Sequence, residues 1–267
     1  MNDAVMRLDE VSFGYHPGEP VVERITADVP SGQLTAVIGP NAAGKTTLLK
    51  LMLGTLSPTR GAISLNGKKL RSVAAGDRAA MMSYVPQRSS ANFAFTVEHV
   101  VAMGRFALPW HGQAMTDVMA ACDLEKLRRK PFIELSAGQQ QRVLLARAMC
   151  QATGDGRVML LDEPTSAMDL RHVHQTMDRL MRLRDAGLAV VVVMHDLNLA
   201  ARYADAVWLM QEGRLVAAGS WRDVLKPAVL EPVYGVKIEE MQGRRDGGTE
   251  GRSGEPGRPV FDARLAE

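Results

Sequence analysis

The residues Gly39-Pro40-Asn41-Ala42-Ala43-Gly44-Lys45-Thr46 form the stretch of sequence that decides the fold. An apolar run at 34–38 precedes them, and residues 45–52 (KTTLLKLM) follow with leucines at helical spacing. This order predicts a strand, a phosphate loop and a helix. Small residues let successive backbone N–H groups turn inward around phosphates, and the helix N-terminus adds positive charge. The alternative, a chance glycine loop that caps a helix, does not account for these flanks.

The last residues of the loop indicate its chemistry. Lys45 is placed to reach the β- and γ-phosphates of a nucleotide, and the Thr46 hydroxyl is placed to bind Mg²⁺. We therefore expect a nucleotide and Mg²⁺ at this loop. The residues predicted to bind the nucleotide here are Gly39, Pro40, Asn41, Ala42, Ala43, Gly44, Lys45, Thr46 and Thr47.

A pair of carboxylates follows the apolar run at 158–161, where the sequence continues Asp162-Glu163-Pro164-Thr165. A buried parallel strand delivers its C-terminal residues to the same sheet edge as the phosphate loop, so both carboxylates are expected to face the nucleotide. We expect Asp162 to bind Mg²⁺ and Glu163 to act as the general base on the attacking water. An isolated pair of this kind is more often a solvated turn, but the phosphate loop favours the functional interpretation.

The composition excludes several classes of protein. The 267 residues include 32 Lys+Arg and 30 Asp+Glu, and this near-neutral balance argues against a nucleic-acid-binding arm. Hydrophobic residues make up 46%, enough for a substantial core, which excludes disorder of the whole chain. No apolar run approaches the roughly 18 to 20 residues of a membrane span, and the N-terminus lacks a signal-peptide pattern. The two cysteines, Cys122 and Cys150, have no paired metal-ligand spacing, so we expect a protein of a reducing cellular interior.

The N-terminal half of the chain changes pattern partway along. Alternating or apolar segments at 5–13, 34–38 and 63–65 indicate a β-rich N-terminal part. From about residue 89 the apolar residues recur at helical intervals, and we expect an inserted α-helical subdomain over about 89–150.

The C-terminal half returns to alternating strands and helices. Apolar runs at 158–161 and 189–194, separated by helical patterns at 139–150 and 171–185, are typical of a mostly parallel core sheet and an α/β fold. After Met241 the sequence continues QGRRDGGTEGRSGEPGRP, which has almost no apolar residue to bury. We therefore expect one domain over 1–241 and a flexible C-terminal segment over 242–267.

The motif Leu135-Ser136-Ala137-Gly138-Gln139-Gln140-Gln141-Arg142 resembles the signature motif of ABC ATPases. Other elements of that family are matched in the family's order over about residues 5–219. They are an aromatic residue (Tyr15), a glutamine after Ser83-Tyr84-Val85-Pro86 (Gln87), a D-loop (Ser166-Ala167-Met168-Asp169) and a histidine after an apolar strand (His195). Taken singly, a Tyr, Gln or His is more often structural, and the shared order favours the functional interpretation.

The resemblance implies a P-loop ABC-type nucleotide-binding domain with an N-terminal antiparallel β-subdomain, and a homodimer in which two chains pack head to tail around two ATP molecules. Ser136, Gly138 and Gln139 would touch the γ-phosphate bound by the partner's phosphate loop. His195 would hydrogen-bond the γ-phosphate, and Gln87 would sense Mg²⁺ and the water. Tyr15 would stack on adenine, and Asp169 would join the nucleotide site through the D-loop.

Two residues depart from the family pattern, because Ala42 and Ala137 stand where the family usually has glycine. If either backbone is left-handed, alanine costs about 1 kcal/mol there. The set Lys45, Thr46, Asp162, Glu163 and His195 is complete, so an active ATP hydrolase is expected.

Two longer stretches resemble one branch of ABC importers. Residues 95–105 (FTVEHVVAMGR) and 195–205 (HDLNLAARYAD) are similar to ATPases that serve uptake of iron-siderophores, haem and cobalamin. This resemblance implies separate integral-membrane permease subunits and a periplasmic or extracellular substrate-binding protein. It also implies a peripheral location on the cytoplasmic side of a prokaryotic inner membrane.

The alternatives are a non-transport ABC ATPase that acts on nucleic acid or protein complexes, and the ATPase of a different importer or exporter. The near-neutral charge gives no support for nucleic acid as a partner. The absence of a long coiled-coil insertion in the sequence also favours the transport interpretation.

Overall fold

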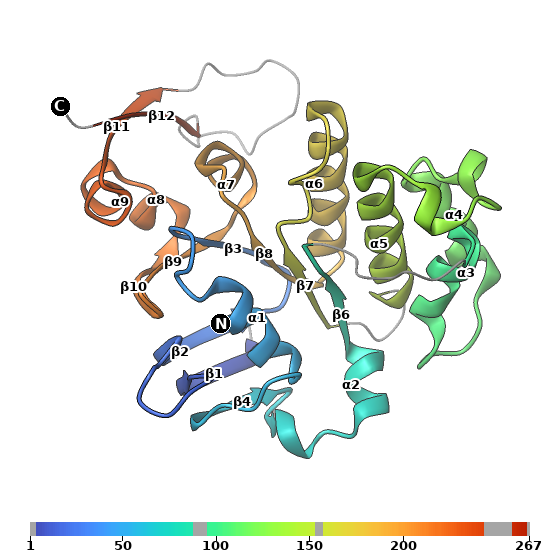
Figure 1. Cartoon of the computed structure of the whole chain (residues 1–267), viewed down its shortest axis with the longest axis horizontal. Helices are drawn as coiled ribbons and strands as arrows, with labels where there is room; N and C mark the ends of the chain where they lie inside the picture. The colour runs from blue at the N-terminus through green and yellow to red at the C-terminus, as the bar shows by residue number, and fades with distance from the viewer. Residues whose placement is uncertain (1–3, 88–94, 153–156, 243–257, 266–267) are drawn as a thin grey trace.

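A computed structural model describes residues 4–87, 95–152, 157–242 and 258–265 of the chain. Its centre is a six-stranded sheet in the order β10-β9-β3-β8-β7-β6, in which all neighbours are parallel except β9 and β10 (Figure 1). Residues of β3, β7 and β8 are buried throughout, as expected for strands covered on both faces. The bounds are β3 (Leu34–Ile38), β6 (Met82–Val85), β7 (Val158–Asp162), β8 (Ala189–Val193), β9 (Ala206–Gln211) and β10 (Arg214–Ser220).

The two faces of this sheet belong to different hydrophobic clusters. In β3, Ala36 and Ile38 pack into the cluster that contains α5, α6 and α7, whereas Val37 packs into the cluster that contains α1. Side chains alternate between the faces of a strand, so every second residue of the buried run serves a different layer. The α-helices of the described residues are α1 (Lys45–Leu53), α2 (Ala75–Met81), α3 (Val97–Ala102), α4 (Gly112–Ala121), α5 (Ala137–Ala152), α6 (Leu170–Asp185), α7 (Leu197–Tyr203), α8 (Trp221–Val224) and α9 (Pro227–Tyr234).

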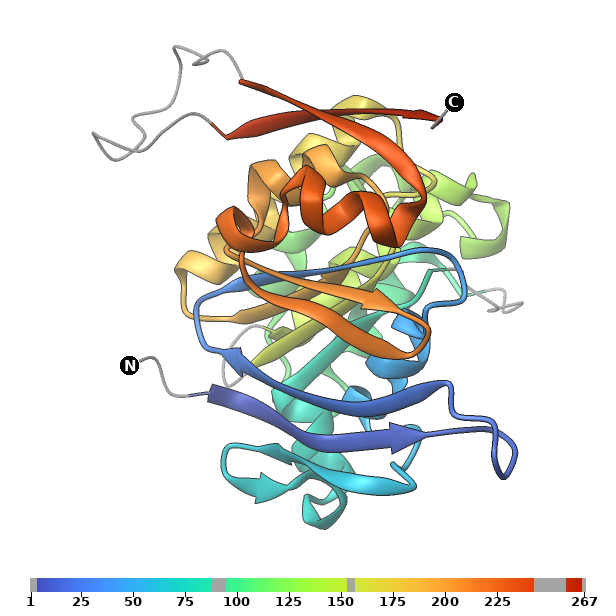
Figure 2. The ribbon, with the colours of Figure 1, turned by 90° about the vertical axis from the view of Figure 1, so that its left-hand side faces the viewer.

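An antiparallel sheet forms the N-terminal part, in the order β2-β1-β4-β5. Its buried face packs with α1 and with the second face of the parallel sheet. Figure 2 shows it at the end of the molecule opposite to the C-terminal strands. The bounds are β1 (Ala4–Phe13), β2 (Val22–Pro30), β4 (Arg60–Leu65) and β5 (Lys68–Lys69).

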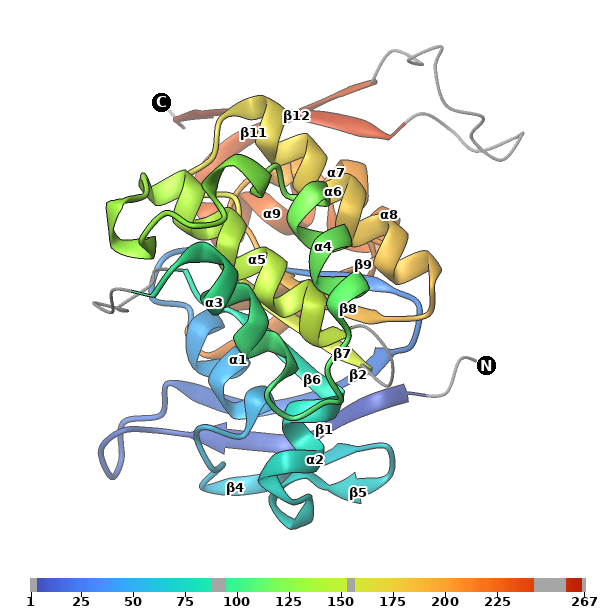
Figure 3. The same cartoon turned by 90° about the vertical axis from the view of Figure 1, so that its right-hand side faces the viewer.

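The inserted helical part contains α3 and α4, which pack together with the long helix α5 (Figure 3). Apolar residues of α5 also lie in the same cluster as the parallel sheet, so this helix joins the two parts. None of the helices in the described ranges is long and apolar enough to cross a membrane.

The C-terminal end differs from the expectation of a flexible segment over 242–267. The strand β12 (Pro259–Leu265) pairs antiparallel with β11 (Val236–Gln242), and Phe261 is buried in the main core. The prediction was wrong for β12 because Phe261 packs into the main core, a place that only the tertiary structure provides. Residues 243–257 and 266–267 of the predicted flexible segment lie outside the described residues.

Candidate functional site

The phosphate loop connects β3 to α1 in a conformation that depends on glycine. A Cβ on Gly39 (φ +143°) would lie 2.1 Å from the Met210 carbonyl oxygen, and one on Gly44 (φ +95°) would lie 2.6 Å from the Val21 carbonyl oxygen. Gly44 is the N-cap of α1 and offers no side chain to its first turn. The N–H groups of that turn are therefore free of a side-chain cap, which suits them to a bound phosphate.

Ala42 lies in this loop with φ +62°, in the left-handed region. The condition under which alanine is costly is therefore met at Ala42. It is not met at Ala137, which begins the right-handed helix α5. Any strain from the two departures is confined to the phosphate loop.

Lys45, the first residue of α1, folds its side chain back over the loop. Its Nζ donates hydrogen bonds to the carbonyl oxygens of Gly39 (2.8 Å) and Pro40 (2.7 Å). Burial lowers the pKa of Lys45, while the nearby carboxylates of Glu163 and Asp162 oppose that shift. The loop thus presents a cation that is held by carbonyl groups and can be transferred to phosphate oxygens.

Asp162 ends β7 at the sheet edge where the phosphate loop begins, as predicted. Its residue is 1% exposed, and its Oδ1 has no hydrogen-bond partner among the described residues. Burial raises the pKa of Asp162, and the Thr46 side chain is among the groups that oppose this shift. A buried carboxylate oxygen without a partner and a neighbouring hydroxyl are the oxygen ligands that Mg²⁺ prefers when nucleotide phosphates complete its shell, so these residues fit the cation.

The Glu163 carboxylate contacts two residues that are far from it in the sequence, Gln87 and His195. Gln87 Nε2 donates a hydrogen bond of 2.7 Å to Glu163 Oε2, and His195 Nε2 lies 2.5 Å from Glu163 Oε1. Each carboxylate oxygen is therefore held by a different side chain. The structure brings Gln87, Glu163 and His195 together, an arrangement typical of residues that act on one reacting group.

The backbone of Glu163 is itself unusual. Its φ is +47°, a left-handed conformation that is costly for a residue other than glycine. Its N–H donates to the Val193 carbonyl oxygen at 3.1 Å, and the Ser166 hydroxyl donates to the Glu163 carbonyl oxygen at 3.1 Å. These bonds hold the turn after β7 so that the side chain points to Gln87 and His195.

One contributor to this arrangement was missed in the sequence. Gln141 on α5 is 4% exposed, and its Nε2 donates a 3.1 Å hydrogen bond to the carbonyl oxygen of Pro86, directly before Gln87. The signature helix is therefore tied to the strand end that presents Gln87. The run of three glutamines at 139–141 gave no signal that its last member faces inward.

The signature residues form a separate group. Ser136 Oγ accepts from the Gln139 N–H (3.3 Å), and Gln139 Oε1 accepts from the Ser136 N–H (3.1 Å), a reciprocal capping box at the start of α5. A Cβ on Gly138 would lie 2.6 Å from the Ala167 carbonyl oxygen, so the signature backbone packs on the D-loop. The hydrogen bonds described for Ser136 and Gln139 connect them to each other and not to Lys45.

Asp169 and Tyr15, also predicted to bind nucleotide, have local roles in the structure. Asp169 is the N-cap of α6, where its Oδ1 accepts from the His172 N–H at 3.0 Å, and the two hydrogen bonds from His172 lower its pKa. Tyr15 is 54% exposed, packs edge-on against Phe13 and lies 3.5 Å from Thr47 through the two hydroxyl oxygens. Tyr15 therefore lies beside α1, close to the phosphate loop.

Comparisons with known proteins agree with this geometry. Residues 22–166 match the ABC transporter family. The hemin import ATP-binding protein HmuV of Pseudomonas putida is 40% identical over 227 residues, which cover 82% of the chain and 88% of that protein. HmuV of Pseudomonas aeruginosa is 40% identical over 242 residues, covering 88% and 94%.

A solved structure described as an ABC transporter of the metal-chelate type, in an inward-facing conformation, matches the fold. Its TM-score is 0.78 at 28% sequence identity, and the match covers 98% of both chains. A second structure, titled as the ATP-binding subunit of an ABC transporter, has a TM-score of 0.77 at 25% identity and covers 86% of this chain. Together with the assembled site, these matches show that the chain belongs to the ABC transporter family, as one of its ATP-binding, ATP-hydrolysing subunits.

Proposed function

We propose that the chain hydrolyses ATP to drive the import of haem through separate permease subunits. The observation that favours haem is the identity of about 40% to hemin import subunits over more than four fifths of the chain. Iron-siderophores and cobalamin are the other cargoes of the branch that the sequence resembles. The selecting residues belong to other subunits, so the cargo is a property of the whole transporter.

The phosphate loop is the part of the site that binds the nucleotide. Lys45 leaves the carbonyl oxygens of Gly39 and Pro40 to bind the β- and γ-phosphates, and the uncapped first turn of α1 donates its N–H groups. Thr46 and Asp162 hold Mg²⁺, which neutralises charge on the phosphates when it is bound. Tyr15 contributes an exposed ring on which adenine stacks.

Glu163 is the general base in this proposal. Its carboxylate accepts a proton from the water that attacks the γ-phosphorus, while the bond from that phosphorus to the β–γ bridging oxygen breaks and ADP leaves. Gln87 and His195, which hold the two carboxylate oxygens, orient the base and are placed to contact the water and the γ-phosphate. The Glu163 carboxylate is therefore already held in a fixed orientation before the nucleotide binds.

A second copy of the chain completes the site. Ser136, Gly138 and Gln139 begin a helix, and their hydroxyl and N–H groups suit a phosphate, yet within one chain their hydrogen bonds do not join them to Lys45. We infer that they contact the γ-phosphate held by the other copy in a head-to-tail homodimer, near its Asp169. Closure of this dimer would draw permease subunits together on the cytoplasmic side of the membrane.

The test is reconstitution of the full transporter in liposomes. The permease that copurifies with the chain from native membranes is identified by mass spectrometry, and the complex is supplied with its binding protein loaded with haem, a ferric siderophore or cobalamin. Haem is expected to stimulate ATP hydrolysis and to accumulate on the side of the membrane that carries the ATPase subunits. The matched control, the same complex with Glu163→Gln, should bind ATP without transport.

Two outcomes would overturn parts of the proposal. Stimulation by the siderophore or by cobalamin, with none by haem, would replace the cargo and leave the ATPase assignment intact. Copurification with nucleic acid in place of an integral-membrane permease would overturn the transport role itself.

A further inference from the structure

Helix α7 begins two residues after His195. Both of its ends are bound by the C-terminal segment, one by the strand β12 and the other by Arg258, directly before that strand. Asp196 caps its N-terminus by accepting from the N–H groups of Asn198 (2.8 Å) and Leu199 (3.1 Å). A seven-residue helix has little stability of its own, so its position depends on what packs against it. We propose that β12 is a positioning element for His195.

The first contact of the C-terminal segment is at the start of α7. The Asn198 side chain accepts from the Phe261 N–H (2.6 Å) and donates to the Phe261 carbonyl oxygen (3.2 Å). Both backbone groups of one strand residue are thus paired with one amide. The Phe261 side chain is 7% exposed and lies in the same hydrophobic cluster as Ala200 and Ala201, so this contact is also apolar.

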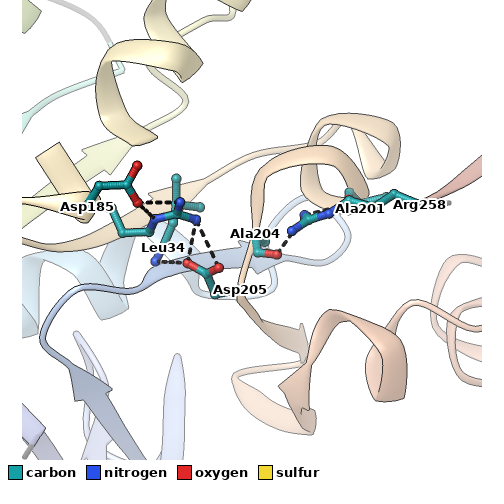
Figure 4. Close-up of polar contacts among 7 residues, drawn as sticks. Leu34, Asp185, Ala201, Ala204, Asp205 and Arg258 are labelled. Carbon is teal, nitrogen blue, oxygen red and sulfur yellow. Dashed lines mark hydrogen bonds and ion pairs between the residues drawn. The ribbon is translucent and has the colours of Figure 1, made fainter. Parts of the chain in front are cut away.

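The second contact of the C-terminal segment is at the end of α7. Arg258, directly before β12, donates from Nη1 to the carbonyl oxygens of Ala201 (2.9 Å) and Ala204 (3.1 Å), as Figure 4 shows. The last carbonyl groups of a helix lack partners within it, and a cation is favoured there. The guanidinium also lies 5.2 Å from the ring centre of Trp221, the buried first residue of α8.

The chain beyond α7 is held from the core side. Asp205 accepts from the Leu34 N–H (2.8 Å) at the start of β3 and pairs with Arg184 at 3.0 Å. Figure 4 shows the contact between Asp205 and Leu34 beside those of Arg258 with Ala201 and Ala204. The exit of α7 is thus anchored to β3, and the contacts of Asn198 and of Arg258 hold the rest of the helix, which leads back to His195.

This inference rests on the proposed role of His195 at the γ-phosphate. A small displacement of a group that contacts the reacting atoms lowers the rate strongly without altering contacts that only bind the nucleotide. Loss of the β12 contacts should therefore lower kcat and leave the KM for ATP unchanged.

The experiment measures steady-state and single-turnover ATP hydrolysis by the full chain carrying Arg258→Ala or Asn198→Ala. Each change is expected to lower kcat about tenfold. Arg258→Lys, which keeps a cationic donor, should recover most of the loss. The control is Arg264→Ala, because Arg264 lies on β12 and its side chain forms exposed ion pairs with Glu239 and Asp262 in place of contacts with α7 among the described residues.

The same substitutions on a His195→Ala background separate positioning from a general loss of structure. If β12 acts through His195, Arg258→Ala should cause no further loss in that background. An equal fold loss in both backgrounds, a raised KM for ATP, or an unchanged kcat would overturn the inference. His195→Ala measured alone tests the proposed role of the histidine, so the two failures are distinguishable. Should Arg258→Ala fail to fold, Asn198→Ala completes the cycle, with hydrogen exchange at 195–204 reporting the release of α7.

Discussion

At Asp162, the carboxylate that is proposed to bind Mg²⁺ is buried at a cost to the stability of the nucleotide-free fold. Its carboxylate is buried at the end of β7 with one oxygen unpartnered among the described residues, and burial raises its pKa. The ionised form is therefore disfavoured in the fold. The stability that comes with the protonated form is complete below the ordinary pKa of 3.8 and is lost as the pH rises through the higher value of the folded protein.

Asp162→Asn is therefore expected to stabilise the nucleotide-free chain at neutral pH by about 1 kcal/mol, because it removes a buried charge. The gain should shrink as the pH falls toward the ordinary pKa of 3.8, because the raised pKa lets the native side chain take up its proton before the unfolded chain does. Urea unfolding at several pH values measures it, with Asp9→Asn on the exposed part of β1 as the control. The variant should also lose the extra stabilisation by Mg²⁺-ATP. Lower stability of Asp162→Asn at every pH would contradict this explanation.

The two alanines that depart from the family pattern are expected to respond in opposite ways to glycine. Ala42→Gly relieves a left-handed alanine on an exposed loop, and after the entropy of the unfolded chain is counted the free energy of unfolding should rise by about 0.5 kcal/mol. Ala137→Gly puts glycine into the first turn of α5 and should lower it by about 0.5 kcal/mol. Chemical denaturation of the two variants side by side measures both. Shifts of the same sign would show that backbone conformation is not the deciding factor.

At the scale of the element, the start of α5 serves two purposes that can be separated. Ser136 closes the capping box, and in the proposed dimer it also faces a phosphate. Ser136→Asp keeps a good cap but adds negative charge, so the stability should be retained while ATP hydrolysis falls sharply. Ser136→Ala should lose about 1 kcal/mol of stability as well.

Thermal unfolding and ATPase rates measured together make this comparison. Thr96→Asp is the matched control, because Thr96 caps α3 in the same way and has no proposed phosphate contact. Full ATPase activity of Ser136→Asp would argue against a composite site built from two chains.

At the scale of the whole molecule, the residues proposed to bind one ATP are divided between two groups within the chain. One surrounds the phosphate loop and Glu163, and the other lies at the start of α5 against the D-loop. Glu163→Gln removes the base while leaving the phosphate contacts in place. ATP hydrolysis should fall at least about 100-fold.

The same variant should form a stable dimer when Mg²⁺-ATP is added, because the nucleotide that joins the two copies is no longer consumed. Sedimentation should show the mass double with Mg²⁺-ATP and remain that of one chain without it. Adding Lys45→Ala should prevent this, since that lysine holds the phosphates. A monomer at saturating ATP, or a dimer that persists without Lys45, would contradict the head-to-tail assembly.

The sequence alone determined the α/β fold, the phosphate loop, the carboxylates after β7 and the family. These features are local: a motif of small residues between a strand and a helix has one geometry wherever it occurs, and buried parallel strands deliver their last residues to a common edge. The strand bounds predicted at 34–38 agree with β3 for this reason.

Only the tertiary structure decided how distant residues meet. Gln87 and Glu163 are 76 positions apart, and Arg258 lies 57 positions from Ala201, so their contacts depend on how the strands and helices pack. The same reason explains why β12 was not foreseen, since its buried Phe261 is stabilised by contacts with α7, which is far from it in the sequence. The tertiary structure also decided the backbone conformation of the two alanines that stand where the family has glycine. Of Ala42 and Ala137, only Ala42 lies in a left-handed turn.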